Sequence, residues 1–151
     1  METERKTCCF FGHIKITEDN SFKSKLYEVI ESLIVHDNID AFLFGSKSEF
    51  NSLCRQIVCE LKEKYTHIRR IYVRAEYPDI GDDYEKYLLQ SYDETYFPKK
   101  IRNAGKAVYI ERNFEMIDKS DICVVYYRGS YNHSSSGTDI SISMRQGKRG
   151  E

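Results

Sequence analysis

Arg112 and a run of small, hydroxyl-bearing residues flank an apolar segment in the last third of the sequence. The segment covers residues 122–127, and the run after it is Ser134, Ser135, Ser136, Gly137 and Thr138. An arginine guanidinium is a charged, planar fork that binds phosphate oxygens in pairs, and backbone N–H groups of a small-residue loop bind the same oxygens. These residues therefore predict a phosphate site. The plainer alternative is an ordinary loop near a surface Glu111–Arg112 pair.

The segment 122–127, ICVVYY, is the element that would position this loop. It is an unbroken apolar and aromatic run with β-branched residues, which is typical of a strand buried on both faces. We interpret it as a central parallel strand whose carboxyl end leads into the loop. Open α/β sheets bind their ligands at that edge.

Two earlier strand-like runs, 7–11 and 41–44, also end at glycine. If the runs are parallel strands of one sheet, both glycine turns lie at the edge where ligands bind. A histidine that follows a strand can contact a ligand or complete a local hydrogen bond, and the sequence favours neither. The residues at the two turns are Gly12, His13, Gly45 and Ser46.

Amphipathic helix patterns follow both glycine turns. Apolar residues recur at spacings of three and four over 22–34 and again over 50–61, where Glu49 is near the helix start. Glu49 can contact a ligand or simply complement the positive end of the helix. Two strand–loop–helix units in succession predict right-handed βαβ topology, and therefore an α/β fold with a mainly parallel sheet.

The remaining segments are less regular. Residues 68–73 resemble a third strand, and the arginines interleaved there fit a half-exposed strand better than a partner surface. The tyrosine-rich region 76–103 is a candidate ligand lid or dimer surface. We expect a short strand at 107–110. After Thr138, apolar residues alternate with serine, but the fold would prefer a helix there, and a helix is our prediction.

Composition excludes several classes of protein. The 151 residues carry a net charge of −1 at a pI of about 6.4, so a nucleic-acid partner is not expected. Residues 1–151 contain no linker or repeat and are interpreted as one domain. The amino-terminal segment has no leader pattern, and no apolar run approaches the roughly 20 residues that span a bilayer, which favours the cytoplasm over a membrane.

The five cysteines fall within strand-like or helix-like patterns, not at paired loop spacings. We therefore expect reduced thiols in a cytosolic protein. Because the sequence has no C-x-x-C pair and its four histidines are scattered, a zinc site is not predicted. No other metal or cofactor is predicted.

The motifs also resemble a known family, the YpsA-like proteins of the SLOG superfamily, which is related to Smf/DprA and Lonely Guy proteins. The opening 8–13, CCFFGH, is similar to that family's CCFTGHR motif. The family's RN, MVD, SD and GGT elements are matched in order by Arg112-Asn113, by 116–118, by 120–121 and by 136–138. The resemblance extends over nearly the whole chain and implies a Rossmann-like three-layer domain that binds a nucleotide or nucleotide-derived ligand and forms a homodimer.

The resemblance also implies roles for individual residues. Some SLOG domains sense nucleotide signals, including in bacterial antiviral systems, whereas Lonely Guy enzymes release the base from a nucleoside monophosphate. The enzymes have a glutamate after their GT motif, but Ile140 or Ser141 stands there, and Ile14 replaces the arginine of GHR. These departures favour a sensor or regulatory module over a nucleotide N-glycosidase. The expected ligand-binding residues are Gly12, His13, Gly45, Ser46, Glu49, Arg112, Asn113, Ser135, Ser136, Gly137 and Thr138, and the candidate catalytic residues of the alternative are Arg112, Glu111, Glu115 and Asp118.

Overall fold

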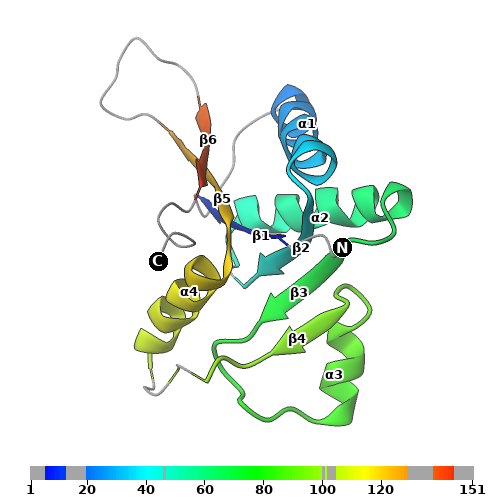
Figure 1. The fold of residues 1–151 in the computed structure, drawn as a ribbon. Helices are drawn as coiled ribbons and strands as arrows, with labels where there is room; N and C mark the ends of the chain where they lie inside the picture. The colour runs from blue at the N-terminus through cyan, green and yellow to red at the C-terminus, as the bar shows by residue number, and fades with distance from the viewer. Residues whose placement is uncertain are drawn as a thin grey trace, which may run out of the picture.

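The protein has an α/β fold built on a central sheet (Figure 1). The computed structural model describes residues 6–12, 20–45, 47–99, 101, 105–128 and 138–144. Within these residues a six-stranded sheet has the order β4-β3-β2-β1-β5-β6. Neighbouring strands are parallel from β4 through β5, and β6 is antiparallel to β5. The strands are β1 (Lys6–Gly12), β2 (Ile39–Phe44), β3 (Arg69–Val73), β4 (Glu94–Tyr96), β5 (Ile122–Arg128) and β6 (Thr138–Met144).

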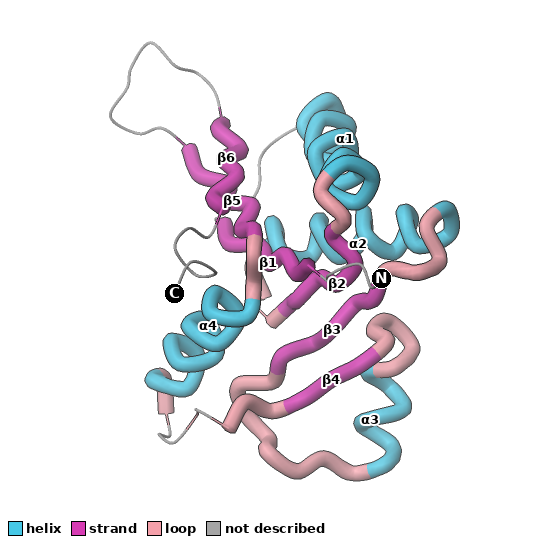
Figure 2. Tube along the Cα trace, in the orientation of Figure 1, coloured by secondary structure: helices cyan, strands magenta, loops and turns pink. Residues whose placement is uncertain are grey.

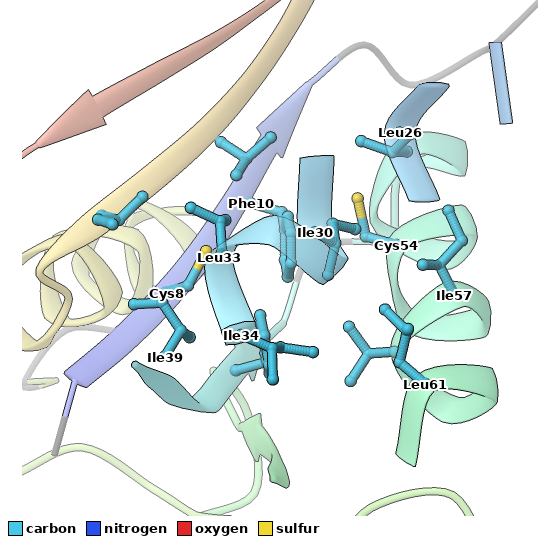
Figure 3. Packing of buried hydrophobic residues seen from close by; sticks show 14 of the residues in the cluster. Cys8, Phe10, Leu26, Ile30, Leu33, Ile34, Ile39, Cys54, Ile57 and Leu61 are labelled. Atoms are coloured by element: carbon cyan, nitrogen blue, oxygen red, sulfur yellow. The ribbon is translucent and has the colours of Figure 1, made fainter. Parts of the chain in front are cut away.

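Helices α1 (Asn20–His36) and α2 (Glu49–Lys64) cover one face of the sheet (Figures 1 and 2). Apolar residues at helical spacing on both helices meet alternate residues of the central strands, which face this side. Cys8 and Phe10 of β1 lie in this cluster beside Ile30, Ile57 and Leu61 (Figure 3). Among the described residues this is the largest hydrophobic cluster, and it holds most of the buried apolar side chains.

Helix α4 (Ala107–Lys119) lies on the other face of the sheet, and the short helix α3 (Asp82–Leu88) leads into the edge strand β4 (Figure 1). Cys9, Leu43 and Ile71 face α4 and pack with its Met116. The sheet is therefore the middle of three layers. These observations confirm the predicted Rossmann-like, three-layer architecture with a mainly parallel sheet.

Two segments differ from the predictions. Residues 107–110 were expected to form a strand, but they are the first turn of α4, because Val108 continues the helical spacing of the buried Arg112, Glu115 and Met116. The segment after Thr138 was expected to be a helix, but it is β6. Apolar residues alternate with serine in this segment, and a period of two residues is that of a strand. The local pattern therefore determines the structure here, and the helix expected from the fold type does not form.

The arginines of β3 and the cysteines have internal partners. Arg69 Nη1 lies 2.6 Å from Glu94 Oε2 and Arg70 Nε lies 3.0 Å from Asp93 Oδ2. Cys9 and Cys123 are reduced thiols with their sulfurs 3.1 Å apart, on facing residues of β1 and β5. Across the described ranges no cluster of three His, Cys, Asp or Glu residues could hold a metal ion, and none of the helices has the length and apolar character needed to cross a bilayer.

Candidate functional site

A cavity of about 350 Å³ lies where β2 and β3 reach their carboxyl ends. The carboxyl ends of parallel strands share one edge of a sheet, so Gly45 after β2 and Glu76 after β3 meet there. Helix α4 ends directly before β5 begins, so its direction is opposite to that of the parallel strands. Its first turns therefore lie at the edge of the sheet where those strands end. The residues on which the site is built are Gly45, Lys47, Glu76, Tyr84, Tyr109 and Arg112.

Arg112 is one of two buried arginines that line this cavity, the other being Arg74, and only 6% of its surface is exposed. Its Nη1 donates a hydrogen bond to the Gly45 carbonyl oxygen at 2.7 Å, and its Nε donates to Asn113 Oδ1 at 3.2 Å. None of the carboxylates in the described residues lies within ion-pair distance of the guanidinium. Burial lowers the pKa of Arg112, against the opposing influence of Tyr72 and Glu76. In the described part of the chain this positive charge therefore has no ion-pair partner, and Tyr72 and Glu76 act on it only through electrostatics.

Two of the three glycines predicted to line the site, Gly12 and Gly45, lie in the described residues, and the structure explains them differently. A Cβ at Gly45 would lie 2.7 Å from Arg112 Cδ and 3.1 Å from the Val73 carbonyl oxygen, so glycine is what lets Arg112 reach the edge of β2. A Cβ at Gly12 would lie 2.5 Å from the Phe50 ring. Gly12 is therefore explained by the packing of α2 on β1, and it does not line the cavity.

The loop after β3 is fixed by Arg74. This side chain is buried and donates hydrogen bonds from Nε to the Tyr77 carbonyl oxygen at 3.1 Å and from Nη2 to that of Pro78 at 3.3 Å. A third bond joins its Nη1 to Thr95 Oγ1 at 3.0 Å. Tyr77 has a φ of 54°, a left-handed conformation that a tyrosine adopts only when its surroundings impose it. Arg74 thus acts as a clamp that holds this part of the cavity wall.

Tyrosine rings connect the charged groups of the cavity. The Arg112 guanidinium lies over the Tyr109 ring at 5.6 Å, and the Tyr109 hydroxyl donates to Glu76 Oε2. Tyr109 therefore stands between the cation and the carboxylate. Burial raises the pKa of Tyr72, the electrostatic influence of Tyr84 and Glu76 raises it further, and that of Arg112 lowers it. The carboxylate, the guanidinium and the rings form one interacting group.

Other residues expected at the site have mixed outcomes. Asn113 accepts its hydrogen bond from Arg112 and so supports the cation. Glu49 is the exposed first residue of α2 and lines a different surface hollow, with Leu53 and Arg55. Thr138 is the first residue of β6. The predicted residues His13, Ser46, Ser135, Ser136 and Gly137 lie outside the described residues.

The three candidate catalytic carboxylates do not line this cavity. Glu115 is buried with 4% of its surface exposed, accepts a hydrogen bond from the Tyr96 hydroxyl at 3.0 Å and faces a separate hollow beneath α4. Glu111 is half-buried and Asp118 is exposed. Glu76 does line the cavity; it is the first residue of the region 76–103 that was expected to form a ligand lid or dimer surface, but it was not singled out as a site residue. Its position just past the third strand was a usable signal, because that is the edge where α/β sheets bind ligands.

A buried guanidinium, a second cation at Lys47, a carboxylate and several tyrosine rings can together bind an anion that carries an aromatic group. Comparison with protein-family models and with curated proteins finds no match for this sequence. The chemistry of the cavity is therefore the basis on which function is inferred.

Proposed function

We propose that this protein binds a nucleotide or a nucleotide-derived ligand in the cavity at the ends of β2 and β3, as a sensor or regulatory module. The observation that carries the proposal is the buried Arg112 guanidinium, which lines this cavity and has no carboxylate within ion-pair distance among the residues that the structure describes. Removing a charge from water costs several kcal/mol unless another charge or hydrogen bonds compensate it. A phosphate that binds Arg112 through two oxygens supplies that compensation.

The rest of the lining fits the other parts of a nucleotide. Lys47 is exposed and can bind a second phosphate oxygen as a point charge. Tyr77 and Tyr84 offer aromatic faces for a base, and stacking of a base on an aromatic ring is typically worth about 1–3 kcal/mol. A cavity of about 350 Å³ also lies in the usual range for small-molecule sites.

The resemblance to YpsA-like SLOG proteins supports the same proposal. Its RN element corresponds to Arg112 and Asn113, which are joined by a hydrogen bond at the cavity. Within the proposal, the protein functions in the cytoplasm and forms a homodimer. The surface that best supports a dimer is the outer side of α4, where Ile110, Phe114 and Ile117 are exposed at helical spacing.

Titration calorimetry with AMP, GMP, CMP and UMP tests the proposal. We expect at least one nucleotide to bind, and Arg112→Gln to weaken it by about a hundredfold, because a charge-assisted pair of hydrogen bonds is lost. Arg69→Gln is the matched control, since Arg69 is paired with Glu94 and does not line this cavity. Equal affinity in the native protein and Arg112→Gln would reject the proposed site.

A nucleotide N-glycosidase is the second candidate, and one observation favours it: Glu76 lies in the same cavity as Arg112. A carboxylate near the ribose can position a water molecule or stabilise positive charge on the sugar. Incubation with nucleoside monophosphates, followed by chromatography for free base, separates the two functions. Turnover that Glu76→Gln abolishes would replace the sensor with a hydrolase, and binding without turnover supports the sensor.

A further inference from the structure

Arg74 is a second buried cation of the cavity, with 8% of its surface exposed. Its three hydrogen bonds, to two backbone carbonyl oxygens and one threonine hydroxyl, all go to neutral groups. Such partners fix the orientation of a guanidinium but leave its charge in place. Because a guanidinium has five N–H groups, one N–H on Nη1 and one on Nη2 have no partner among the described residues. These two groups can bind an anion.

The two buried arginines belong to the ends of neighbouring strands. Arg74 directly follows β3, whereas Arg112 donates a hydrogen bond to Gly45, which directly follows β2. A Cβ on Gly45 would lie 3.1 Å from the Val73 carbonyl oxygen, so the two strand ends are in close contact. Burial raises the pKa of Tyr72, and the electrostatic influence of both guanidiniums opposes that rise. Two like charges therefore act together at one edge of the sheet.

The lining of the cavity, as far as the structure describes it, has an excess of positive charge. Its cations are Arg74, Arg112 and Lys47. Its one carboxylate, Glu76, is exposed and accepts a hydrogen bond from the Tyr109 hydroxyl. Three positive charges and one negative charge give the described lining a net charge of +2. A ligand that compensates this charge carries more than one negative charge itself.

The two guanidiniums determine how this negative charge is arranged on the ligand. A guanidinium binds two oxygens of one anionic group, and a terminal phosphate has three oxygens in all. One phosphate therefore cannot bind both arginines in this way. Two phosphates that share a bridging oxygen can, since neighbouring strands are only about 4.8 Å apart. Lys47, a point charge, can then contact the remaining oxygen of the terminal phosphate.

We infer that the ligand is a nucleoside diphosphate, and that one of its two linked phosphates binds Arg112 while the other binds Arg74. This inference rests on the proposed function, because Arg112 anchors the nucleotide in both. It adds the number and the linkage of the phosphates. It also assigns Arg74 as a phosphate-binding residue, in addition to its hydrogen bonds with the loop after β3.

Calorimetry in metal-free buffer with three adenosine nucleotides tests the inference, and the matching guanosine nucleotides form a second series. The three are the 5′-monophosphate, the 5′-diphosphate and the 3′,5′-bisphosphate, in which two phosphates are present but are not linked. We expect the 5′-diphosphate of at least one series to bind about tenfold more tightly than the other two members, because only its phosphates reach both guanidiniums.

Variants of Arg74 locate the source of this preference. In Arg74→Gln the diphosphate should lose its advantage, whereas the monophosphate should bind as it does to the native protein. Because Arg74 also holds the loop, Arg74→Lys is a second variant, which keeps a charged donor but lacks the planar fork, and the advantage should fall there too. Arg69→Gln is the matched control, since it removes the same charge from the other end of β3 and should leave the advantage unchanged.

The two proposals fail in different ways. If the monophosphate or the bisphosphate binds as tightly as the diphosphate in both series, or if the advantage survives in both Arg74 variants, the inference is overturned and the proposed function stands. Loss of monophosphate binding in both variants would assign Arg74 to the loop alone, which also overturns the inference. If no nucleotide of any kind binds the native protein, both proposals are rejected.

Discussion

Helices α2 and α4 pack on opposite faces of one sheet and bury opposite kinds of side chain. The buried face of α2 is almost wholly apolar, with Phe50, Ile57 and Leu61 fully covered. Helix α4 buries Arg112 and Glu115, while Phe114 is 59% exposed on its outer side. The starts of the helices differ as well: Ser48 accepts a hydrogen bond from the Asn51 N–H of α2, and Lys106 makes no such side-chain bond for α4.

The difference separates the part of the molecule that stabilises the fold from the part that we propose binds the ligand. Apolar burial on the α2 side contributes free energy of folding directly. Burial of charged groups on the α4 side contributes little or opposes folding, so its explanation must be sought in function. Four substitutions test this contrast, and they follow in order of decreasing expected effect on stability.

Phe50→Ala should lower the free energy of unfolding by about 3–5 kcal/mol, the usual cost of removing a buried phenyl ring. Phe50 is fully buried, stacks on Tyr126 with centroids 5.1 Å apart and lies against Gly12. Urea denaturation monitored by circular dichroism measures the change. A loss below about 1 kcal/mol would mean that the α2 face is less important for stability than its burial indicates.

Tyr96→Phe should cost about 2 kcal/mol, because it removes a hydrogen bond to the buried Glu115 carboxylate. Burial, followed by this bond, raises the pKa of Tyr96 in the folded protein. A raised folded pKa means that the contribution is complete below the ordinary tyrosine pKa of about 10 and is lost as the pH rises beyond it. The stability difference between native protein and variant should therefore shrink in alkaline denaturation series, and a constant difference would exclude this linkage.

Arg112→Met should leave the free energy of unfolding within about 1 kcal/mol of the native value, because methionine fills similar space without a buried charge. Nucleotide binding should be lost in the same variant. Thermal unfolding with and without nucleotide measures both properties. A large loss of stability would show that Arg112 is needed by the fold itself, and the contrast between the two helices would disappear.

Phe114→Glu should change the unfolding of the monomer by less than about 0.5 kcal/mol, as is usual for exposed positions. If the outer side of α4 joins two copies of the chain, the variant should instead halve the mass measured by light scattering at micromolar concentration. Val35→Glu is the control, since Val35 is 48% exposed on α1, on the other side of the sheet. A native protein that is already monomeric would exclude the dimer.

Most of the fold could be predicted from the sequence because the spacing of apolar residues within each helix or strand is a local pattern. The apolar residues of α2 recur at helical spacing, and the apolar run of β5 is too short for a helix, so both elements are visible without a structure. The two errors have different causes: a helix was expected after Thr138 because the topology was given more weight than the local pattern, and a strand was expected at 107–110 because a short apolar run resembles one. In β6 the alternation of apolar residues with serine that ends at Met144 is the pattern of a strand. The apolar run around Val108 resembles a strand, but Val108 also continues the helical spacing of α4.

The site was only partly predictable. Arg112 and Gly45 were found because their residue types have a specific chemistry at strand ends. Glu76 and Tyr109 were not singled out. They lie 33 positions apart in the sequence and meet only in the folded protein, and a local sequence pattern does not show such a contact. Gly12 was assigned to the ligand, although the structure explains it by the Phe50 ring. A glycine after a strand indicates close approach, but the sequence does not show what approaches.

The central place of β1 affects how the protein is made. Its first neighbour, β2, follows soon after it, but Cys9 on its other edge faces Cys123 of β5, 114 positions later. At about 5–20 residues per second, translation needs on the order of ten seconds to supply that second neighbour. During this interval one edge of the nascent sheet has backbone groups without strand partners, and such edges attract other chains. Synthesis of the segment around Val124 therefore covers the open edge of β1, and β6 then covers the outer edge of β5.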